Sequence, residues 1–231
     1  MSTPITPEEA LAALQAHADP EKAAAMAAYH KAARSYLGLS NEITGALATE
    51  WRKASPDHAH LTALAQGLWE SDIFEARIAA GKLFIQARMR PDDHLAWEWI
   101  NQTVPQFDSW AIADAVAQGG QKRLVQHPTR LDTLEGWTNA EHLWTRRAAF
   151  TFTLPFVKSR HPSAVEQAAR ARVLDWAARL ADDHAWFIQK AIAWWLRDLS
   201  KHAPDTTRAW LDTHGDRLKP FAFKEAARHL P

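Results

Sequence analysis

Four short stretches of this 231-residue chain decide its fold, because they repeat one pattern: FEARIAA (residues 74–80), AIADAVA (111–117), WTRRAAF (144–150) and FIQKAIA (187–193). In three of them an aromatic residue is followed by two variable positions, a basic residue and small apolar residues. The stretch at 111–117 fits between them. Taken in chain order, the fourth positions of the four stretches are separated by 37, 33 and 43 residues.

The spacing of apolar residues between these stretches is that of amphipathic helices. Leu61, Leu64 and Leu68 illustrate the three- and four-residue spacing, and we find no clear run of strand-like alternation. Prolines punctuate the chain at intervals that leave one or two helices in each segment. Repeats of about 40 residues suit two-helix HEAT-type units, which stack into a solenoid. The sequence therefore predicts an all-α fold, a curved solenoid of about six HEAT-like helical pairs with a concave face. We expect one domain over residues 1–231, with residues 1–19 as an N-terminal helical extension.

The composition excludes several classes of site. The chain has no cysteine, so no disulfide framework, thiolate nucleophile or thiolate metal site is expected. The N-terminus lacks a basic start followed by an apolar core, and no stretch of 18 apolar residues occurs. We therefore expect a cytoplasmic protein that is not in a membrane, and a monomer.

The charge is balanced overall but divided unevenly along the chain. The formal net charge is 0, yet residues 116–231 carry 18 of the 27 Lys and Arg and only 12 of the 27 Asp and Glu. Such asymmetry is typical of a protein with a polyanion-binding half. A solvated mixed surface explains the same charges equally well.

The repeated spot of the pattern is basic in three repeats and acidic in one. It holds Arg77, Arg147 and Lys190, but Asp114 in the repeat between. A row of such positions lines one face of a solenoid. The row predicts a basic face with one carboxylate in it, unless Asp114 is only a surface residue of a loosely matching helix.

Tryptophan flanks that carboxylate in a pattern that suggests a site. Trp110 and Asp114 are i and i+4, so they share one helix face, and Lys190 and Trp194 repeat the spacing. The alternative for both indoles is core packing. The sequence has no HExxH motif, no base flanking a serine and no glycine-rich phosphate loop. We therefore expect no metal and no other cofactor.

At these residues the chain resembles the AlkD-like DNA glycosylases, the HEAT-repeat family of DNA alkylation repair. The resemblance spans residues 20–230 in the family's order, and its most specific part is Trp186 to Arg197. The other matching segments are 27–31, 36–38, 68–69, 108–114, 143–149 and 224–226.

The resemblance implies roles for individual residues. Asp114 matches the catalytic aspartate, and Trp110 and Trp194 match tryptophans that contact the deoxyribose of the lesion. The implied DNA contacts are Arg147 near the lesion, Tyr29 at the same cleft, and Lys190 and Arg197 at the phosphate backbone, beside Arg77 from the basic row. The chain departs from the family at Ala193, where glycine is frequent, and at residues 40–43.

The chemistry of the implied substrate agrees with these residues. N3- and N7-alkylpurines carry a positive charge, so their glycosidic bond is weak, and a carboxylate stabilises the oxocarbenium-like sugar that forms when it breaks. We therefore expect a monofunctional DNA glycosylase of base excision repair that acts on alkylated purines in double-stranded DNA and is nucleoid-associated when bound to DNA. The alternatives are a catalytically silent DNA-binding relative and a HEAT-repeat scaffold for proteins.

Overall fold

The computed structural model describes residues 4–230, which contain helices and loops but no β-strand; one isolated bridge joins Ser35 and Ile73. The predicted all-α class is therefore confirmed. The chain divides into two compact units, residues 1–123 and 124–231. The predicted single domain over 1–231 includes residues 1–3 and 231, which lie outside the described part of the chain.

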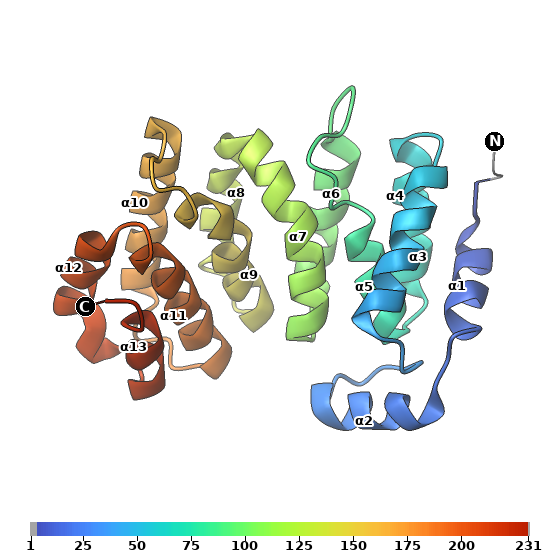
Figure 1. The fold of residues 1–231 in the computed structure, drawn as a ribbon, viewed down its shortest axis with the longest axis horizontal. Helices are drawn as coiled ribbons and strands as arrows, with labels where there is room; N and C mark the ends of the chain where they lie inside the picture. The colour runs from blue at the N-terminus through green and yellow to red at the C-terminus, as the bar shows by residue number, and fades with distance from the viewer. Residues whose placement is uncertain (1–3, 231) are drawn as a thin grey trace. The chain divides into compact units, whose positions relative to one another are not determined.

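The first unit is built from six helices, a short 3-10 helix and most of a seventh helix (Figure 1). Their bounds are α1 Pro7–Gln15, α2 Pro20–His30, α3 Asn41–Ala54, α4 His58–Glu70, α5 Phe74–Lys82, α6 His94–Thr103, η1 Val104–Gln106 and α7 Trp110–Gln126.

The second unit continues from the end of α7 with six further helices and three short 3-10 helices. Their bounds are η2 Pro128–Arg130, α8 Leu131–Trp137, α9 Leu143–Thr153, η3 Leu154–Val157, α10 Ala164–Arg179, α11 Trp186–Ser200, α12 Pro204–His214, η4 Gly215–Arg217 and α13 Pro220–Ala226.

Local sequence signals explain where many of these helices begin. Thr6 and Ser163 each form a capping box with the glutamate three residues later, at the starts of α1 and α10. Asp19, Ser40 and Asp57 cap α2, α3 and α4 with their side-chain oxygens. Proline occupies the first helical position of α2, α12 and α13, as expected from the punctuation of the sequence.

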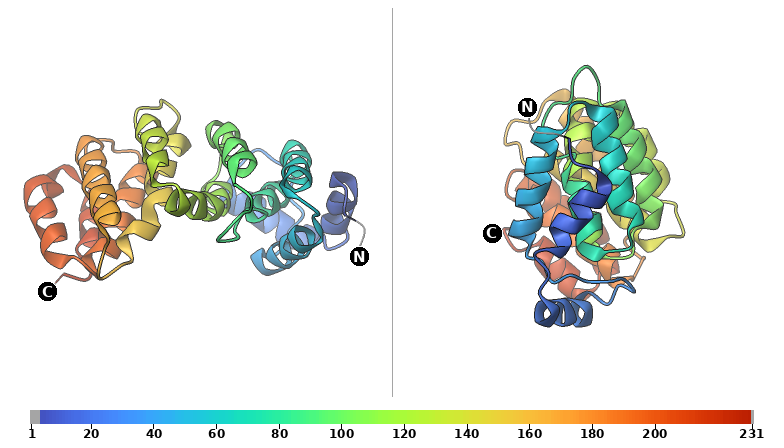
Figure 2. Two further views of the ribbon diagram at one scale, coloured as in Figure 1. Left: turned by 90° about the horizontal axis from the view of Figure 1, so that it is seen from above. Right: turned by 90° about the vertical axis from the view of Figure 1, so that its right-hand side faces the viewer.

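In the first unit, α5 packs against α3 and α4, and α1 and α6 pack against α4. Helix α1 lies within the predicted N-terminal extension of residues 1–19, of which residues 1–3 lie outside the described chain. Helix α2 lies across the ends of these helices (Figures 1 and 2). Gly81 of α5 lies so close to α7 that an added Cβ would be 2.8 Å from the backbone nitrogen of Val116. This close approach fixes the face of α7 that carries Trp110 and Asp114 relative to α5.

In the second unit, α11 is the central helix, and it packs against α9, α12 and α13. Gln189 on α11 is fully buried. Its Nε2 donates to the carbonyls of Ala181 (2.9 Å) and Asp183 (3.0 Å), and its Oε1 accepts from the backbone N–H of Lys219 (2.8 Å). These bonds tie the segment before α11 and the start of α13 to the middle of α11, because an unpartnered buried amide is costly.

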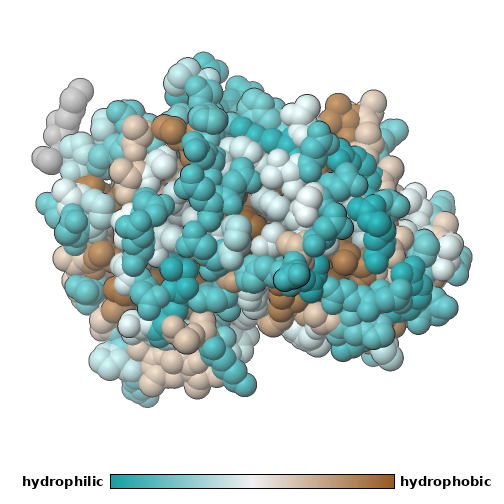
Figure 3. Space-filling model, turned by 180° about the vertical axis from the view of Figure 1, so that it is seen from behind, coloured by the Kyte–Doolittle hydropathy of each residue, from teal (hydrophilic) through white to brown (hydrophobic). Residues whose placement is uncertain are grey.

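Six of the twelve tryptophans are buried in the core, so core packing accounts for half of the unusual tryptophan content. Trp110 and Trp194 are among the part-exposed ones. Seen from behind, the surface is mostly hydrophilic, and the alanine-rich α2 forms a weakly hydrophobic area at the lower left (Figure 3). Within residues 4–230, no helix is both long enough and apolar enough to cross a membrane.

Candidate active site and DNA-contacting residues

The two site residues predicted on α7 line one cavity of the first unit. Ser109 directly precedes α7, and its carbonyl oxygen accepts the first helical hydrogen bond from the N–H of Ala113 (3.0 Å), so Trp110 stands in the first turn of the helix. Asp114 follows one turn later, and both side chains are partly exposed. The cavity has a volume of about 380 Å³, at the small end of the range for ligand sites.

Four helices contribute to the walls of this cavity, namely α2, α3, α5 and α7. Beside Trp110 and Asp114, its lining includes the imidazole of His30, the ring of Phe74 and the carboxylate of Glu75. The cavity thus combines two carboxylates with flat aromatic surfaces. Such surfaces attract cations, and so do the carboxylates.

Aromatic rings surround Trp110 at the edge of the cavity. The His30 ring lies 5.2 Å from the Trp110 ring, centroid to centroid, and 4.6 Å from the ring of Phe74. Tyr29 meets Trp110 edge to face at 6.2 Å, and its own side chain is 71% exposed. The structure therefore brings together three of the predicted residues, Tyr29, Trp110 and Asp114, around one site.

His30 is a residue that the sequence analysis did not single out. Burial lowers the pKa of its imidazole, and the nearby Glu75 carboxylate opposes that effect. Its Nδ1 is buried and has no hydrogen-bond partner among residues 4–230. The only signal in the sequence was its place beside Tyr29 in a segment that matches the family.

Glu75 also escaped notice, although it lies in the first repeated stretch. Its side chain is fully buried and accepts three backbone hydrogen bonds, from Leu37 (3.0 Å), Gly38 (2.7 Å) and Leu39 (3.3 Å). Gly38 has a φ of +82°, and a Cβ there would lie 2.2 Å from the carbonyl oxygen of Asp19. The carboxylate thereby holds the segment that joins α2 to α3 in a conformation that only glycine permits.

The side chain of Arg77 is held by contacts with Trp69. Its Nε donates to the carbonyl oxygen of Trp69 (3.0 Å), and its guanidinium lies 4.5 Å from the centroid of the Trp69 ring. Burial lowers the pKa of Arg77. The side chain is partly exposed, so what it offers to DNA is limited by this contact.

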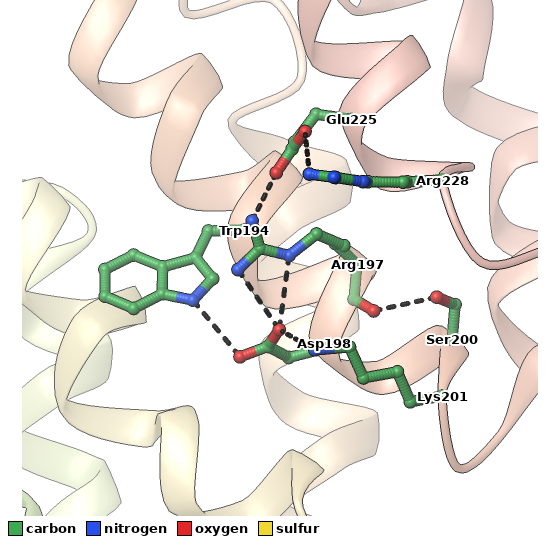
Figure 4. Close-up of polar contacts among 7 residues, drawn as sticks. All are labelled: Trp194, Arg197, Asp198, Ser200, Lys201, Glu225 and Arg228. Carbon is green, nitrogen blue, oxygen red and sulfur yellow. Dashed lines mark hydrogen bonds and ion pairs between the residues drawn. The ribbon is translucent and has the colours of Figure 1, made fainter.

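In the second unit, Trp194 is oriented by a neighbour on its own helix. Its Nε1 donates to Oδ2 of Asp198 (3.1 Å), one turn further along α11. The other oxygen of Asp198 faces Lys201 (3.1 Å) and the guanidinium of Arg197 (3.2 Å), as Figure 4 shows. Arg197 also pairs with Glu225 of α13. The predicted phosphate contact Arg197 is thus part of a network that holds the indole.

The remaining two predicted DNA contacts differ in exposure. Arg147 on α9 is 4% exposed, and its guanidinium lies 5.9 Å from the centroid of the Trp144 ring. Lys190 on α11 is exposed, and its Nζ lies 4.5 Å from the centroid of the Trp186 ring. Lys190 therefore presents its charge to solvent, whereas Arg147 offers little surface to a phosphate.

Metal ligands are not gathered anywhere in the described chain. Among residues 4–230, no three His, Cys, Asp or Glu side chains form a group that could hold a metal ion.

Comparison with known proteins gives consistent results for sequence and structure. The family described as "DNA alkylation repair enzyme" matches residues 10–230. A solved structure described as a predicted DNA alkylation repair enzyme from Enterococcus faecalis is 25% identical, with a TM-score of 0.77 over 93% of this chain and 97% of that one. AlkD2 from Streptococcus mutans is 19% identical, with a TM-score of 0.62 over 83% of this chain and 91% of that one, a likeness of fold. No curated protein matches the sequence significantly.

Proposed function

Because this chain belongs to the DNA alkylation repair enzyme family, we propose that it is a DNA glycosylase for cationic N3- and N7-alkylpurines in duplex DNA. It hydrolyses the N-glycosidic bond and leaves an abasic site. The observation that carries the proposal is the Asp114 carboxylate in a cavity with aromatic walls, one helical turn from Trp110. We further propose that it acts as a monomer, in the cytoplasm and at the nucleoid.

The reaction uses the charge that the lesion already carries. The electrons of the glycosidic bond pass to the alkylated purine, which departs neutral, and the sugar is left as an oxocarbenium-like cation. Asp114 stabilises this cation as it forms and orients the water that attacks C1′, and the water gives up one proton. The faces of Trp110 and Trp194 pack against the sugar and favour its positive charge.

The environment of His30 supports a preference for cationic lesions. A neutral base such as uracil needs a general acid as it leaves, worth about 100- to 10,000-fold in rate. The pKa of His30 is lowered by burial, so its imidazole is predominantly neutral at pH 7 and is a poor general acid there. Uracil and other neutral bases should therefore stay in the DNA, while N7-methylguanine and N3-methyladenine are released.

DNA binding is supported by the basic second half of the chain. Lys190 is exposed on α11, one turn from Trp194, which supports a phosphate contact close to the sugar that Trp194 is proposed to contact. Phosphate contacts fix the position of a protein on DNA without reading its sequence. Arg147, Arg197, Tyr29 and Arg77 are proposed as weaker contributors, because each is buried, paired or neutral.

The test is release of a labelled base from methylated duplex DNA. Asp114→Asn should keep the fold and DNA binding but excise at least about 100-fold more slowly, the scale of losing one preorganised electrostatic group. The matched control is Asp212→Asn, an exposed carboxylate on α12. Excision at the wild-type rate in Asp114→Asn would remove Asp114 from the mechanism. A wild-type protein that binds DNA but releases no methylated purine would instead be a silent relative.

A further inference from the structure

Two large aromatic side chains of the second unit are exposed and stacked on one another, and a third is exposed on the same short helix as one of them. Trp186 starts α11 and is 48% exposed, while Phe221 and Phe223 in the first turn of α13 are 37% and 43% exposed. The rings of Trp186 and Phe221 are stacked, 5.9 Å apart between centroids and inclined by 27°. We call Trp186 and Phe221 the aromatic patch.

The fold holds the patch in place without burying it. Ala222 and Ala226 fill the contact between α13 and α11 and are fully buried, so the phenylalanines between and beside them point outward. The Gln189 bond to the backbone of Lys219 fixes the start of α13. A contiguous set of exposed aromatics costs hydration free energy, and it commonly marks a binding surface.

The charges around the patch are positive. Lys190 lies 4.5 Å from the Trp186 ring, and Lys219 and Lys224 flank the two phenylalanines in sequence. None of the three lysines has an ion-pair partner among residues 4–230. The acid next to Lys224 in sequence, Glu225, is paired with Arg197. Flat apolar rings among unpaired lysines complement a ligand with flat bases and phosphates.

The patch also lies on the helix face that carries Trp194. Trp186, Lys190 and Trp194 are i, i+4 and i+8 on α11, so they form one stripe in which an indole, an ammonium and an indole alternate. At a rise of about 1.5 Å per residue, the stripe is about 12 Å long. That length corresponds to about three to four base-pair steps along a duplex.

We propose that the aromatic patch is a stacking site for an unpaired nucleobase of the bound DNA, within about four nucleotides of the sugar that Trp194 contacts. The position relative to the lesion rests on the proposed function. The base must be unpaired because the faces of paired bases are covered by their neighbours in the duplex. The proposed reaction itself creates such a base, since excision leaves the nucleotide opposite the abasic site without a partner.

The test uses undamaged DNA, so that it does not depend on excision. The probe is a duplex with one bulged 2-aminopurine, compared with a fully paired duplex of the same sequence. Trp186→Ala should bind the bulged duplex about 5- to 150-fold more weakly, the range for one lost base–aromatic stack. Its affinity for the paired duplex should change by less than about twofold. Wild-type protein should quench the 2-aminopurine fluorescence, and Trp186→Ala should not.

Two variants sharpen the result. Trp186→Phe keeps an aromatic face and should retain most of the preference for the bulge. Val165→Ala removes another exposed apolar side chain of the same unit, 51% exposed on α10, and should behave as wild type. Because Trp186 is exposed, its replacement should leave the circular dichroism spectrum unchanged.

The possible failures are distinguishable. Equal bulge binding by Trp186→Ala and wild type would overturn the stacking site and leave the proposed function intact. The wild type could instead self-associate and show no preference for the bulge, with Trp186→Ala abolishing the self-association. That result would identify the patch as a contact between copies of the protein and would also overturn the stacking site. Absence of binding to either duplex would refute DNA binding as a whole. Wild-type excision by Asp114→Asn would refute the proposed role of Asp114 and leave the bulge-binding result unchanged.

Discussion

The most specific prediction about stability concerns the buried carboxylate of Glu75. It accepts hydrogen bonds from three successive backbone N–H groups, of Leu37, Gly38 and Leu39, at 2.7–3.3 Å. In Glu75→Gln the amide keeps one acceptor oxygen, and its NH₂ group faces donors. At least one buried N–H then loses its acceptor, at about 1–3 kcal/mol, and the other bonds lose the benefit of a charged acceptor. We expect a loss of about 2–4 kcal/mol, a large share of a typical unfolding free energy of about 5–15 kcal/mol.

Urea unfolding followed by circular dichroism measures this loss, which corresponds to a fall in Tm of about 5–15 °C for a chain of this length. Hydrogen exchange gives a local readout, because the amides of residues 37–39 should exchange faster in Glu75→Gln. The control is Glu70→Gln, an exposed carboxylate whose recorded partner is the Gln66 side chain (2.6 Å). Unchanged exchange at residues 37–39 together with a wild-type midpoint would refute the reasoning.

Two further predictions concern charge. In binding titrations at several salt concentrations, the plot of log K against log salt for duplex binding should be less steep for Lys190→Ala by about 0.9, the contribution of one phosphate contact. An unchanged slope would show that Lys190 contacts no phosphate. Burial lowers the pKa of His30 below its usual 6.5, so on acidification the unfolded chain takes up a proton before the folded chain does. Stability should therefore be insensitive to this group above about pH 7 and fall as the pH drops below about 6.5. In urea titrations, His30→Gln should lose less unfolding free energy than wild type between pH 7.5 and 5. Some pH dependence should remain, because burial also lowers the pKa of His202. An equal pH dependence of stability in both proteins would contradict the prediction.

The helical architecture could be predicted because its signals are local. Three- and four-residue apolar spacing, proline at helix starts and the repeated stretches all act within one or two turns, and they predicted an all-α chain correctly. The pair Trp110 and Asp114 was predictable for the same reason, since a spacing of four on a helix decides that both side chains meet one surface. Their shared cavity is the structural result of that spacing.

The rest of the site depends on contacts between distant residues. Glu75 bonds to backbone groups 36–38 positions earlier, and His30 meets Trp110 across 80 residues, so no local pattern announces either contact. The surroundings of basic residues were harder still to predict, because the sequence does not show which group a positive charge contacts. Arg77 lies against Trp69 and Arg197 against Glu225, and only Lys190 among these three is without such a partner carboxylate or carbonyl in the described chain.

The hydrogen bond from Trp194 to Asp198 has an entropic consequence. A tryptophan side chain that rotates freely before binding loses that freedom on the DNA, and ordering one side chain at an interface costs about 0.5–1.5 kcal/mol. Here the indole is already held in one rotamer by a carboxylate that Arg197 and Lys201 hold in turn. The loss of rotational freedom therefore accompanies folding of α11, so that in the proposed function the free protein meets DNA with this indole already oriented.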